Sequence, residues 1–130
     1  MLKSENRLRK RKEFAYLYNH GLSKHAENLT IVYNPTKFRA TKIGFSVTKK
    51  IGKANVRNRV KRVLRAIVRD LVGNIPANYN IVFIARNGIE NLNFSEIKRQ
   101  VLLVLKKSGL LVSSEKFKFS MPFLAIKTIL

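Results

Sequence analysis

The segment at residues 49–69, KKIGKANVRNRVKRVLRAIVR, limits most strongly how this chain can fold. At the helical repeat of about 100° per residue, its apolar residues fall on one side and most of its basic residues on the other. We therefore expect a helix over residues 54–71, with its apolar side on a core and its basic side in water. The apolar stripe consists of Val56, Val60, Val63, Leu64, Ile67 and Leu71.

The basic side of this helix has no acidic residues nearby in the sequence to offset its charge. Like charges four residues apart, such as Lys61 and Arg65, repel by a few tenths of a kcal/mol per pair, and no acidic residue occurs from Asn28 through Arg69. A charge run often marks only a solvated face, but this one favours an anionic partner. Its basic residues are Lys49, Lys50, Lys53, Arg57, Arg59, Lys61, Arg62, Arg65 and Arg69.

The charge of the whole chain also favours an anionic partner. Its 130 residues, enough for one domain, include 27 Lys plus Arg against 7 Asp plus Glu, a formal net charge of +20. Nucleic acid is the leading partner class, and an anionic membrane surface is second. There are no cysteines, no apolar run long enough to span a membrane and no apolar signal region. We expect a cytoplasmic protein that does not cross a membrane.

The remaining periodic segments predict an α+β fold. We expect a helix at 13–20 ended by Gly21 in a left-handed conformation, strands at 29–33, 42–48 and 79–85, and a last helix from Asn93 to about Gly109. Asn93 with Glu96 forms a capping pair for that last helix. The general chirality of strand–helix–strand units predicts a right-handed crossover through the basic helix.

The sequence offers no catalytic site of its own. A two-metal nuclease needs several carboxylates converging on ions roughly 4 Å apart, whereas the acids here are scattered singly. His20 and His25 have no acidic or Lys partner at a useful spacing, and Gly52-Lys53 lacks the rest of a phosphate-binding loop. We therefore expect a binding protein without catalytic or metal-ligating residues. The acids are Glu5, Glu13, Glu27, Asp70, Glu90, Glu96 and Glu115.

Aromatic residues are candidates for stacking on unpaired bases. Phe14 and Tyr18 share one side of the first helix, while Tyr33, Phe45 and Tyr79 lie in or beside strands. A core role is the alternative, which we favour for Phe45 and leave open for Phe14 and Tyr18. In the strand at 42–48, small residues alternate with apolar ones and leave one face open to a flat ligand.

Several segments of the sequence, centred on the basic helix, resemble a known protein family. Arg57-Asn58-Arg59, followed by residues 60–62 and Arg65, is similar to the signature motif of the bacterial ribonuclease P protein subunit. Residues 43–52 resemble the strand and loop that precede this motif, and 81–86 a later strand. Asn6-Arg7-Leu8 with Phe14, Tyr18, His20 and Gly21 resembles the opening helix. The likeness covers about residues 6–111.

This resemblance implies a two-layer α–β sandwich of order αβββαβα, with a left-handed β-α-β crossover that carries the basic helix. It also implies a small basic cofactor of a catalytic RNA that removes the 5′ leader from precursor tRNA. The partners would be that RNA and precursor tRNA, with no protein partner and no membrane. Cleavage would use Mg²⁺ held mainly by the RNA, with no dedicated site on the protein.

The resemblance also implies roles for individual residues. Arg57, Asn58, Arg59, Lys61, Arg62 and Arg65 would contact the catalytic RNA or the leader, and we add Lys49, Lys50, Lys53 and Arg69 for their charge. Phe14 and Tyr18 would line a central cleft for the leader, and we add Tyr33, Phe45 and Ser46 as candidates. An ungapped register puts Val32 where the family has an aromatic residue, so either Val32 or Tyr33 faces that cleft.

The chain then divides into a domain at 1–111 and an apolar tail at 112–130. Residues 1–10 are expected to be a mobile basic arm, and the RNA-binding residues that we assign to the arm are Arg7, Arg9, Lys10, Arg11 and Lys12. The tail has no counterpart in the family, and packing, partner docking and a membrane-surface role stay open for it. A ribosomal protein and a stand-alone RNA hydrolase are the competing functions; neither accounts for the residues as well.

Overall fold

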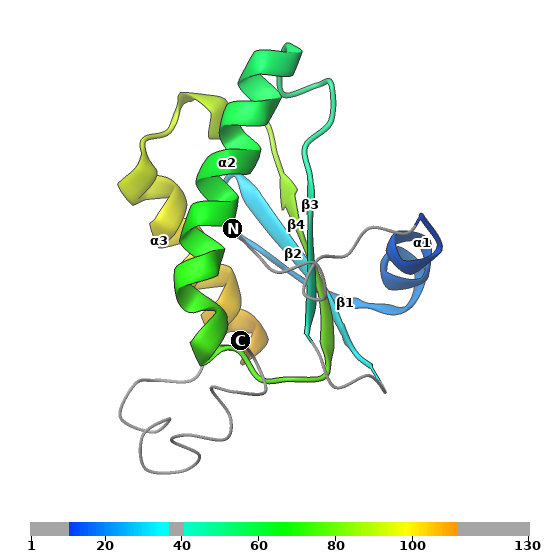
Figure 1. Ribbon diagram of the computed structural model, residues 1–130. Helices are drawn as coiled ribbons and strands as arrows, with labels where there is room; N and C mark the ends of the chain where they lie inside the picture. Colours follow the sequence, from blue (N-terminus) through cyan, green and yellow to red (C-terminus); the bar gives the residue numbers. More distant parts are fainter. Residues whose placement is uncertain (1–10, 37–40, 112–130) are drawn as a thin grey trace.

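A computed structural model describes residues 11–36 and 41–111 of the chain, which form one sheet flanked by helices (Figure 1). The order αβββαβα that the resemblance implied is confirmed. The elements are α1 (Arg11–His20), β1 (Leu22–His25), β2 (Leu29–Pro35), β3 (Lys42–Ser46), α2 (Ala54–Leu71), β4 (Tyr79–Ala85) and α3 (Phe94–Ser108), with 3₁₀ turns η2 (Val72–Asn74) and η3 (Ile89–Asn91).

The assignment of two residues to the expected basic arm needs a correction. Arg11 and Lys12 belong to the first turn of α1, not to an arm. The other predicted arm residues, Arg7, Arg9 and Lys10, lie outside the described residues, as does the tail at 112–130.

The sheet has the strand order β1-β2-β4-β3. β4 pairs antiparallel with β2 and parallel with β3, while β1 pairs antiparallel with β2. The apolar strand expected to be central, β4, therefore lies between β2 and β3. β4 is also the only described element that holds these two strands in one sheet.

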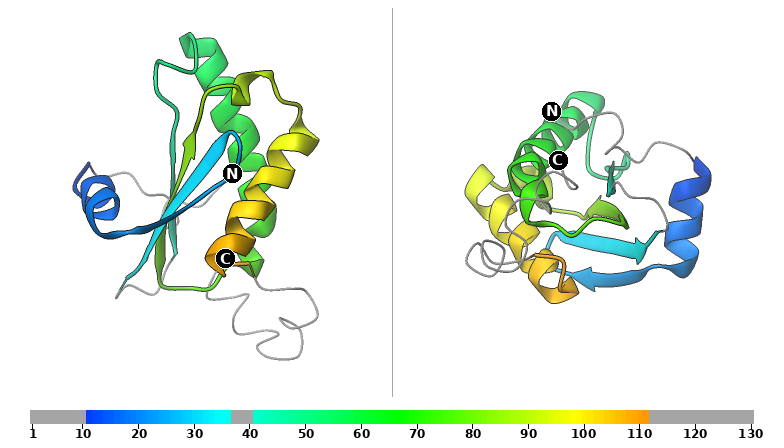
Figure 2. Two further views of the ribbon diagram at one scale, coloured as in Figure 1. Left: turned by 180° about the vertical axis from the view of Figure 1, so that it is seen from behind. Right: turned by 60° about the horizontal axis from the view of Figure 1, so that its bottom comes forward.

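Both faces of the sheet are covered in its middle, because successive side chains of a strand point to opposite faces. Ile31 and Phe83 belong to the main core, which α2 and α3 cover. Val32 and Val82 form a smaller cluster on the other face with Leu17 of α1. Figure 2 shows α2 and α3 together on one side of the sheet and α1 alone on the other.

Helix α2 docks through the apolar stripe that the sequence predicts. Val60, Leu64 and Ile67 are buried, and the other stripe residues pack partly buried against the same core. Val68 is also buried and extends the stripe by one residue. Within the described ranges, no helix is both long enough and apolar enough to cross a membrane.

The crossover from β3 through α2 to β4 is left-handed, so the expectation from general chirality is wrong. Seen with β3 and β4 pointing up and α2 in front, β4 lies to the left of its parallel neighbour β3 (Figures 1 and 2). The main core decides the side, because α2 packs over Ile43 and Phe83. The opposite face carries the smaller Gly44 and Val82 and is taken by α1. Burial of the larger apolar face outweighs the usual chirality.

Helix α3 begins and ends where the sequence predicts. The Asn93 side chain caps it by accepting a hydrogen bond of 2.9 Å from the backbone N–H of Glu96. Gly109 ends it in the left-handed region with φ 75°. Both signals are local, which is why they were readable from the sequence.

Two features near the end of α1 differ from our reading of the residues. β1 is a strand of 4 residues, all exposed, so it carries no alternation of apolar side chains to predict it. Gly21 does not have the positive φ expected of it. Instead, a Cβ at this position would lie 2.6 Å from the Leu17 carbonyl oxygen and 2.8 Å from Val32 Cγ1. Gly21 allows α1 to turn closely onto the sheet.

Candidate nucleic-acid interface

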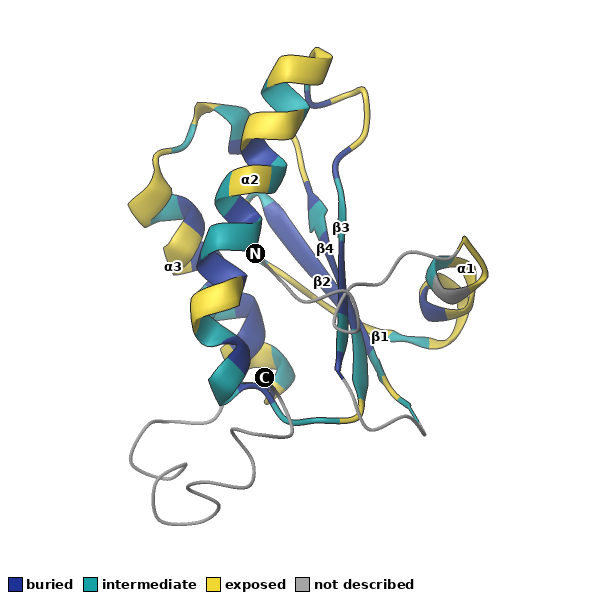
Figure 3. Ribbon diagram, in the orientation of Figure 1, coloured by how far each residue is buried: buried dark blue, intermediate teal, exposed yellow. Residues whose placement is uncertain are grey.

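The outer side of α2 presents the basic residues. Arg62 and Arg69 are exposed, and Lys61 and Arg65 are half-buried. Figure 3 shows the alternation along α2, with buried residues towards the sheet and exposed ones away from it. Lys49, Lys50 and Lys53, in the loop between β3 and α2, are exposed as well. The positive charge thus runs from the end of β3 along the outer side of α2.

Most of this charge has no partner within the part of the chain that the structure describes. Among the described residues, the side chains of Lys61, Arg62 and Arg65 form no hydrogen bond and no ion pair. Arg69 lies 3.7 Å from Asp70, but both side chains are well exposed, so this pair contributes little. The basic side of α2 is therefore left for an external anion.

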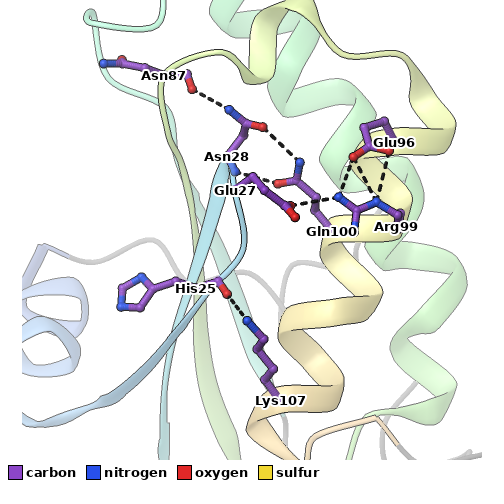
Figure 4. Close-up of polar contacts among 8 residues, drawn as sticks. All are labelled: His25, Glu27, Asn28, Asn87, Glu96, Arg99, Gln100 and Lys107. Atoms are coloured by element: carbon purple, nitrogen blue, oxygen red, sulfur yellow. Dashed lines mark hydrogen bonds and ion pairs between the residues drawn. The ribbon is translucent and has the colours of Figure 1, made fainter.

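The described acidic residues other than Asp70 are paired away from the basic side of α2. The Arg99 Nη2 atom donates to Glu27 Oε2 at 2.9 Å and to Glu96 Oε1 at 2.6 Å (Figure 4). Hydrogen bonds from its own backbone and from Arg99 lower the pKa of Glu27, and the Arg99 hydrogen bond lowers the pKa of Glu96. Glu90 accepts from the backbone N–H of Gly88 at 2.8 Å. Apart from Asp70 at the end of α2, the described carboxylates thus lie near the start of α3, away from Lys61, Arg62 and Arg65.

The polar contacts in Figure 4 also hold α3 to the sheet. Gln100 is buried, and its side chain exchanges hydrogen bonds with Asn28, at 2.8 Å to the backbone and 3.1 Å to the side chain. Asn28 in turn donates to the Asn87 carbonyl at 2.7 Å. Lys107 donates to the His25 carbonyl at 2.7 Å. These contacts fix the β1–β2 turn against α3 and pair the polar groups of Asn28 and Gln100.

The N-terminus of α2 has no acidic or capping side chain. Its N-cap residue, Lys53, makes no side-chain capping bond, and the first turn contains no acid. The positive end of the helix dipole therefore lies beside further positive charge, and its free N–H groups point outward. Such an arrangement suits a phosphate group.

Two residues of the signature motif, Arg57 and Arg59, are more involved in the fold itself than the sequence suggested. Arg59 donates a hydrogen bond to the carbonyl oxygen of Glu90 in η3, which fastens the first half of α2 to the β4–α3 connection. Arg57 is half-buried, and its Nε has no hydrogen-bond partner. The contact of these two residues with RNA stays a prediction.

The five predicted cleft residues do not lie together. Tyr33 is only 7% exposed and packs in the main core, and Phe45 stacks on the buried Phe83 with ring centroids 5.8 Å apart. Both therefore face α2 and α3, and their expected place beside Phe14 and Tyr18 is corrected. Val32 is the residue of β2 that faces α1. The strand alternation allowed either register, so only the three-dimensional structure decides between them.

Phe14, Tyr18 and Ser46 do share one region. The Phe14 ring lies 6.4 Å from the Tyr18 ring, and Tyr18 is 47% exposed. Phe14 packs against the small cluster together with Ile84, whose neighbour on β3 is Ser46. The chain runs from Ser46 directly into the loop that carries the exposed lysines. Aromatic and basic side chains thus follow one another around the end of β3.

A second ring pair on α1 was not singled out from the sequence. The rings of Tyr16 and His20 lie 4.4 Å apart, and Tyr16 is 56% exposed. Their spacing of four residues in a helical segment was the signal that could have revealed them. Across residues 11–36 and 41–111, no group of three His, Asp or Glu side chains could hold a metal ion.

Comparison with known proteins gives a consistent result. The family model described as Ribonuclease P matches residues 2–109. A ribonuclease P protein component from Oceanobacillus iheyensis is 40% identical over 111 residues, covering 85% of this chain and 92% of that protein. One from Caldanaerobacter subterraneus is 36% identical over 110 residues, covering 85% and 95%.

Solved structures agree in fold. The Staphylococcus aureus RNase P protein superposes with a TM-score of 0.77 at 26% identity, covering 82% of this chain and 97% of that one. The Thermotoga maritima RNase P protein superposes with a TM-score of 0.71 at 30% identity, covering 78% and 96%.

Proposed function

This chain belongs to the ribonuclease P protein family, which implies a role in tRNA 5′ processing, and we propose that it is the protein cofactor of a ribonuclease P ribozyme. In this role it binds the catalytic RNA and the single-stranded 5′ leader of precursor tRNA in the cytoplasm. The holoenzyme then cleaves the leader endonucleolytically and leaves the mature 5′ end.

The observation that carries the proposal is the unpaired basic side of α2. Phosphate groups of RNA would occupy the places where Lys61, Arg62 and Arg65 have no acidic partner. Binding there relieves the repulsion between these side chains and releases counterions from the RNA. The uncapped N-terminus of α2 and the exposed lysines before it extend the surface to the end of β3.

The leader is assigned to the α1 side of the sheet. Phe14 and Tyr18 offer ring faces to unpaired bases, and Ser46 offers a hydroxyl group nearby. Because this region leads directly into the lysine loop, one RNA strand can have its bases against α1 and its phosphates against the loop. Tyr33 and Phe45 are not part of this assignment, since they pack in the main core.

Catalysis is assigned to the RNA partner. Mg²⁺, held mainly by that RNA, supplies the activation of water and the stabilisation of the leaving oxygen. The described carboxylates of this chain do not suit such a site, because each already has a partner and they do not converge. The residues of the protein instead bind and position the two RNAs.

The experiment is cleavage of a 5′-labelled precursor tRNA by a bacterial ribonuclease P RNA at low Mg²⁺, with and without this protein. We expect the protein to restore cleavage at the mature 5′ end and to be inert without the RNA. Cleavage by the protein alone would point to a stand-alone hydrolase. No enhancement, together with equal affinity for precursor and mature tRNA, would overturn the proposal.

Variants locate the interaction. Lys61→Ala and Arg65→Ala in the holoenzyme should weaken precursor tRNA binding more than mature tRNA binding. Lys98→Ala is the matched control, since Lys98 is an exposed lysine of α3 and its loss changes the net charge by the same amount. An equal loss of affinity for both tRNAs would mean that these residues do not bind the leader, while binding of the catalytic RNA by α2 would remain possible.

A further inference from the structure

Helix α1 carries two aromatic pairs on opposite flanks. Residues 16 and 18 are separated by about 200° around a helix, so Tyr16 and Tyr18 project to different sides. Leu17 lies between them and is buried against Val32 and Val82 of the sheet. One flank therefore carries Phe14 and Tyr18, and the other carries Tyr16 and His20. Only the first pair has a role in the proposed function.

The second flank overlooks a different part of the sheet. Phe14 packs against the same small cluster as Ile84, which lies towards the end of β4. The opposite flank, with Tyr16, is therefore placed over the beginning of that strand. There Asn80 pairs across the sheet with Asn34 and Lys42. Because these residues alternate with buried core positions, all three lie on the α1 face. The tilted ring pair of Tyr16 and His20 and this row of polar side chains thus border the same face of the sheet.

The packing of the fold explains neither the exposed rings of Tyr16 and His20 nor the unpaired amide oxygen of Asn80. Tyr16 is 56% exposed, whereas Leu17 provides the packing that holds α1 on the sheet. Asn80 is half-buried, and its Oδ1 has no hydrogen-bond partner. An exposed ring pair and an unpaired amide oxygen independently indicate a ligand that stacks and forms hydrogen bonds.

We propose that Tyr16 and His20 form a second stacking site, which takes a nucleobase of single-stranded RNA. Lys12, four residues before Tyr16 on the same flank, binds the adjacent phosphate. The Asn80 amide lies on the sheet below and meets the edge of the base after a turn of its side chain, since its oxygen is covered in the unbound protein. This inference rests on the proposed function in one respect, that RNA is the ligand.

The chemistry of the flank favours RNA over a protein surface. The exposed apolar area consists of one tyrosine ring beside an imidazole, much less than a stable protein interface buries. Exposed aromatic rings with a nearby lysine match the planar faces and phosphates of unpaired nucleotides. The nucleotide can come from the precursor leader, beyond the part held by Phe14 and Tyr18, or from an unpaired segment of the catalytic RNA.

The test compares Tyr16→Ala with Tyr16→Phe in the reconstituted holoenzyme. The measured quantities are the affinity for precursor tRNA and the affinity of the protein for the catalytic RNA. Loss of the ring should weaken one of these by roughly fivefold to 150-fold, and phenylalanine should restore it. Phe94→Ala is the matched control, because Phe94 is a similarly exposed ring on α3, across the sheet.

The source of the base follows from which affinity changes. A loss confined to precursor tRNA that disappears when the leader is shortened or made abasic assigns the site to the leader. A loss confined to the catalytic RNA assigns it to an unpaired segment there. Wild-type affinity for both RNAs in Tyr16→Ala would overturn the inference. A loss of affinity that is the same with an abasic leader and that also occurs in Tyr16→Phe would overturn it as well.

Failure of this inference is distinguishable from failure of the proposed function. If Tyr18→Ala weakens precursor binding and Tyr16→Ala weakens binding of neither RNA, the cofactor role stands and only the second stacking site is lost. If the wild-type protein does not enhance cleavage at all, the cofactor role itself fails. Circular dichroism of each variant verifies that α1 is still folded.

Discussion

At the scale of single residues, Arg99 shows how the chain separates its few acids from its many bases. Its guanidinium group bridges Glu27 and Glu96, so the β1–β2 turn and α3 are joined by charge as well as by Gln100. The same contacts raise the pKa of Arg99 and lower the pKa values of both carboxyl groups. The acids stabilise the fold here and leave α2 uncompensated.

These shifts predict a pH dependence of stability. Both carboxyl pKa values are lower in the folded protein than in the unfolded chain, so their contribution is complete above the unfolded value of about 4.3 and is lost as the pH falls through the folded values. Urea unfolding at about pH 6 and about pH 3 should show this loss. Arg99→Gln should lose less between the two pH values. An unchanged difference in that variant would assign the effect to other groups.

The sequence predicted residues whose role is local and missed those that depend on distant neighbours. Asn93, Glu96 and Gly109 were assigned correctly because a helix cap involves only adjacent backbone. Gly21 was assigned for the wrong reason, since the atoms that exclude a Cβ belong partly to Val32 of another strand. The sequence left open whether Val32 or Tyr33 faces α1, because both are apolar enough to be buried, and the structure places Val32 there.

At the scale of elements, α1 is attached to the sheet by a small number of side chains. Leu17 is its only fully buried residue among those described, and it packs on Val32 and Val82. Helix α2, in contrast, is buried along its length against the main core. Of the two helices proposed to bind RNA, α1 is therefore packed on the sheet by fewer buried side chains than α2.

This difference predicts that Leu17→Ala impairs the function of α1 and leaves that of α2 intact. The substitution should lower the free energy of unfolding by about 2–3 kcal/mol and weaken precursor tRNA binding, while catalytic-RNA binding through α2 persists. Urea unfolding and the two affinities measure these effects. Asn19→Ala, at an exposed position of the same helix, is the control. Unchanged stability in Leu17→Ala would mean that α1 is held by other contacts.

The elements themselves were more predictable than their arrangement. The periodic apolar residues indicated α1, α2, α3 and the strands β2 to β4, because each pattern repeats within its own segment. β1 lacks such a pattern, since its residues are exposed. The handedness of the crossover depends on which sheet face offers the larger side chains, and a strand sequence alone does not tell which helix each face meets.

At the scale of the whole molecule, the charge is distributed unevenly. The described carboxylates lie near α3 and at the end of α2, whereas the unpaired cations run along the outer side of α2 and through the loop before it. An RNA approaching the protein is therefore drawn to one side. Composition predicted the partner class, but only the fold shows which surface is free.

This distribution predicts how salt affects binding. The logarithm of the precursor tRNA affinity should fall linearly with the logarithm of the salt concentration, and Lys61→Ala or Arg62→Ala should each reduce the slope by about 0.7–0.9. Titrations at several salt concentrations measure the slope. Lys98→Ala should leave it unchanged. Equal slopes for all three variants would mean that α2 does not contact phosphate.

The position of β4 has a consequence for how the protein is made. β2 and β3 are synthesised long before β4, yet they lie on either side of it and are not neighbours. A nascent chain that ends before Tyr79 therefore has no complete sheet, and the apolar stripe of α2 has only part of its core to pack on. Folding on the ribosome must wait for the last strand to emerge. Until then the most basic helix of the protein is exposed beside ribosomal RNA.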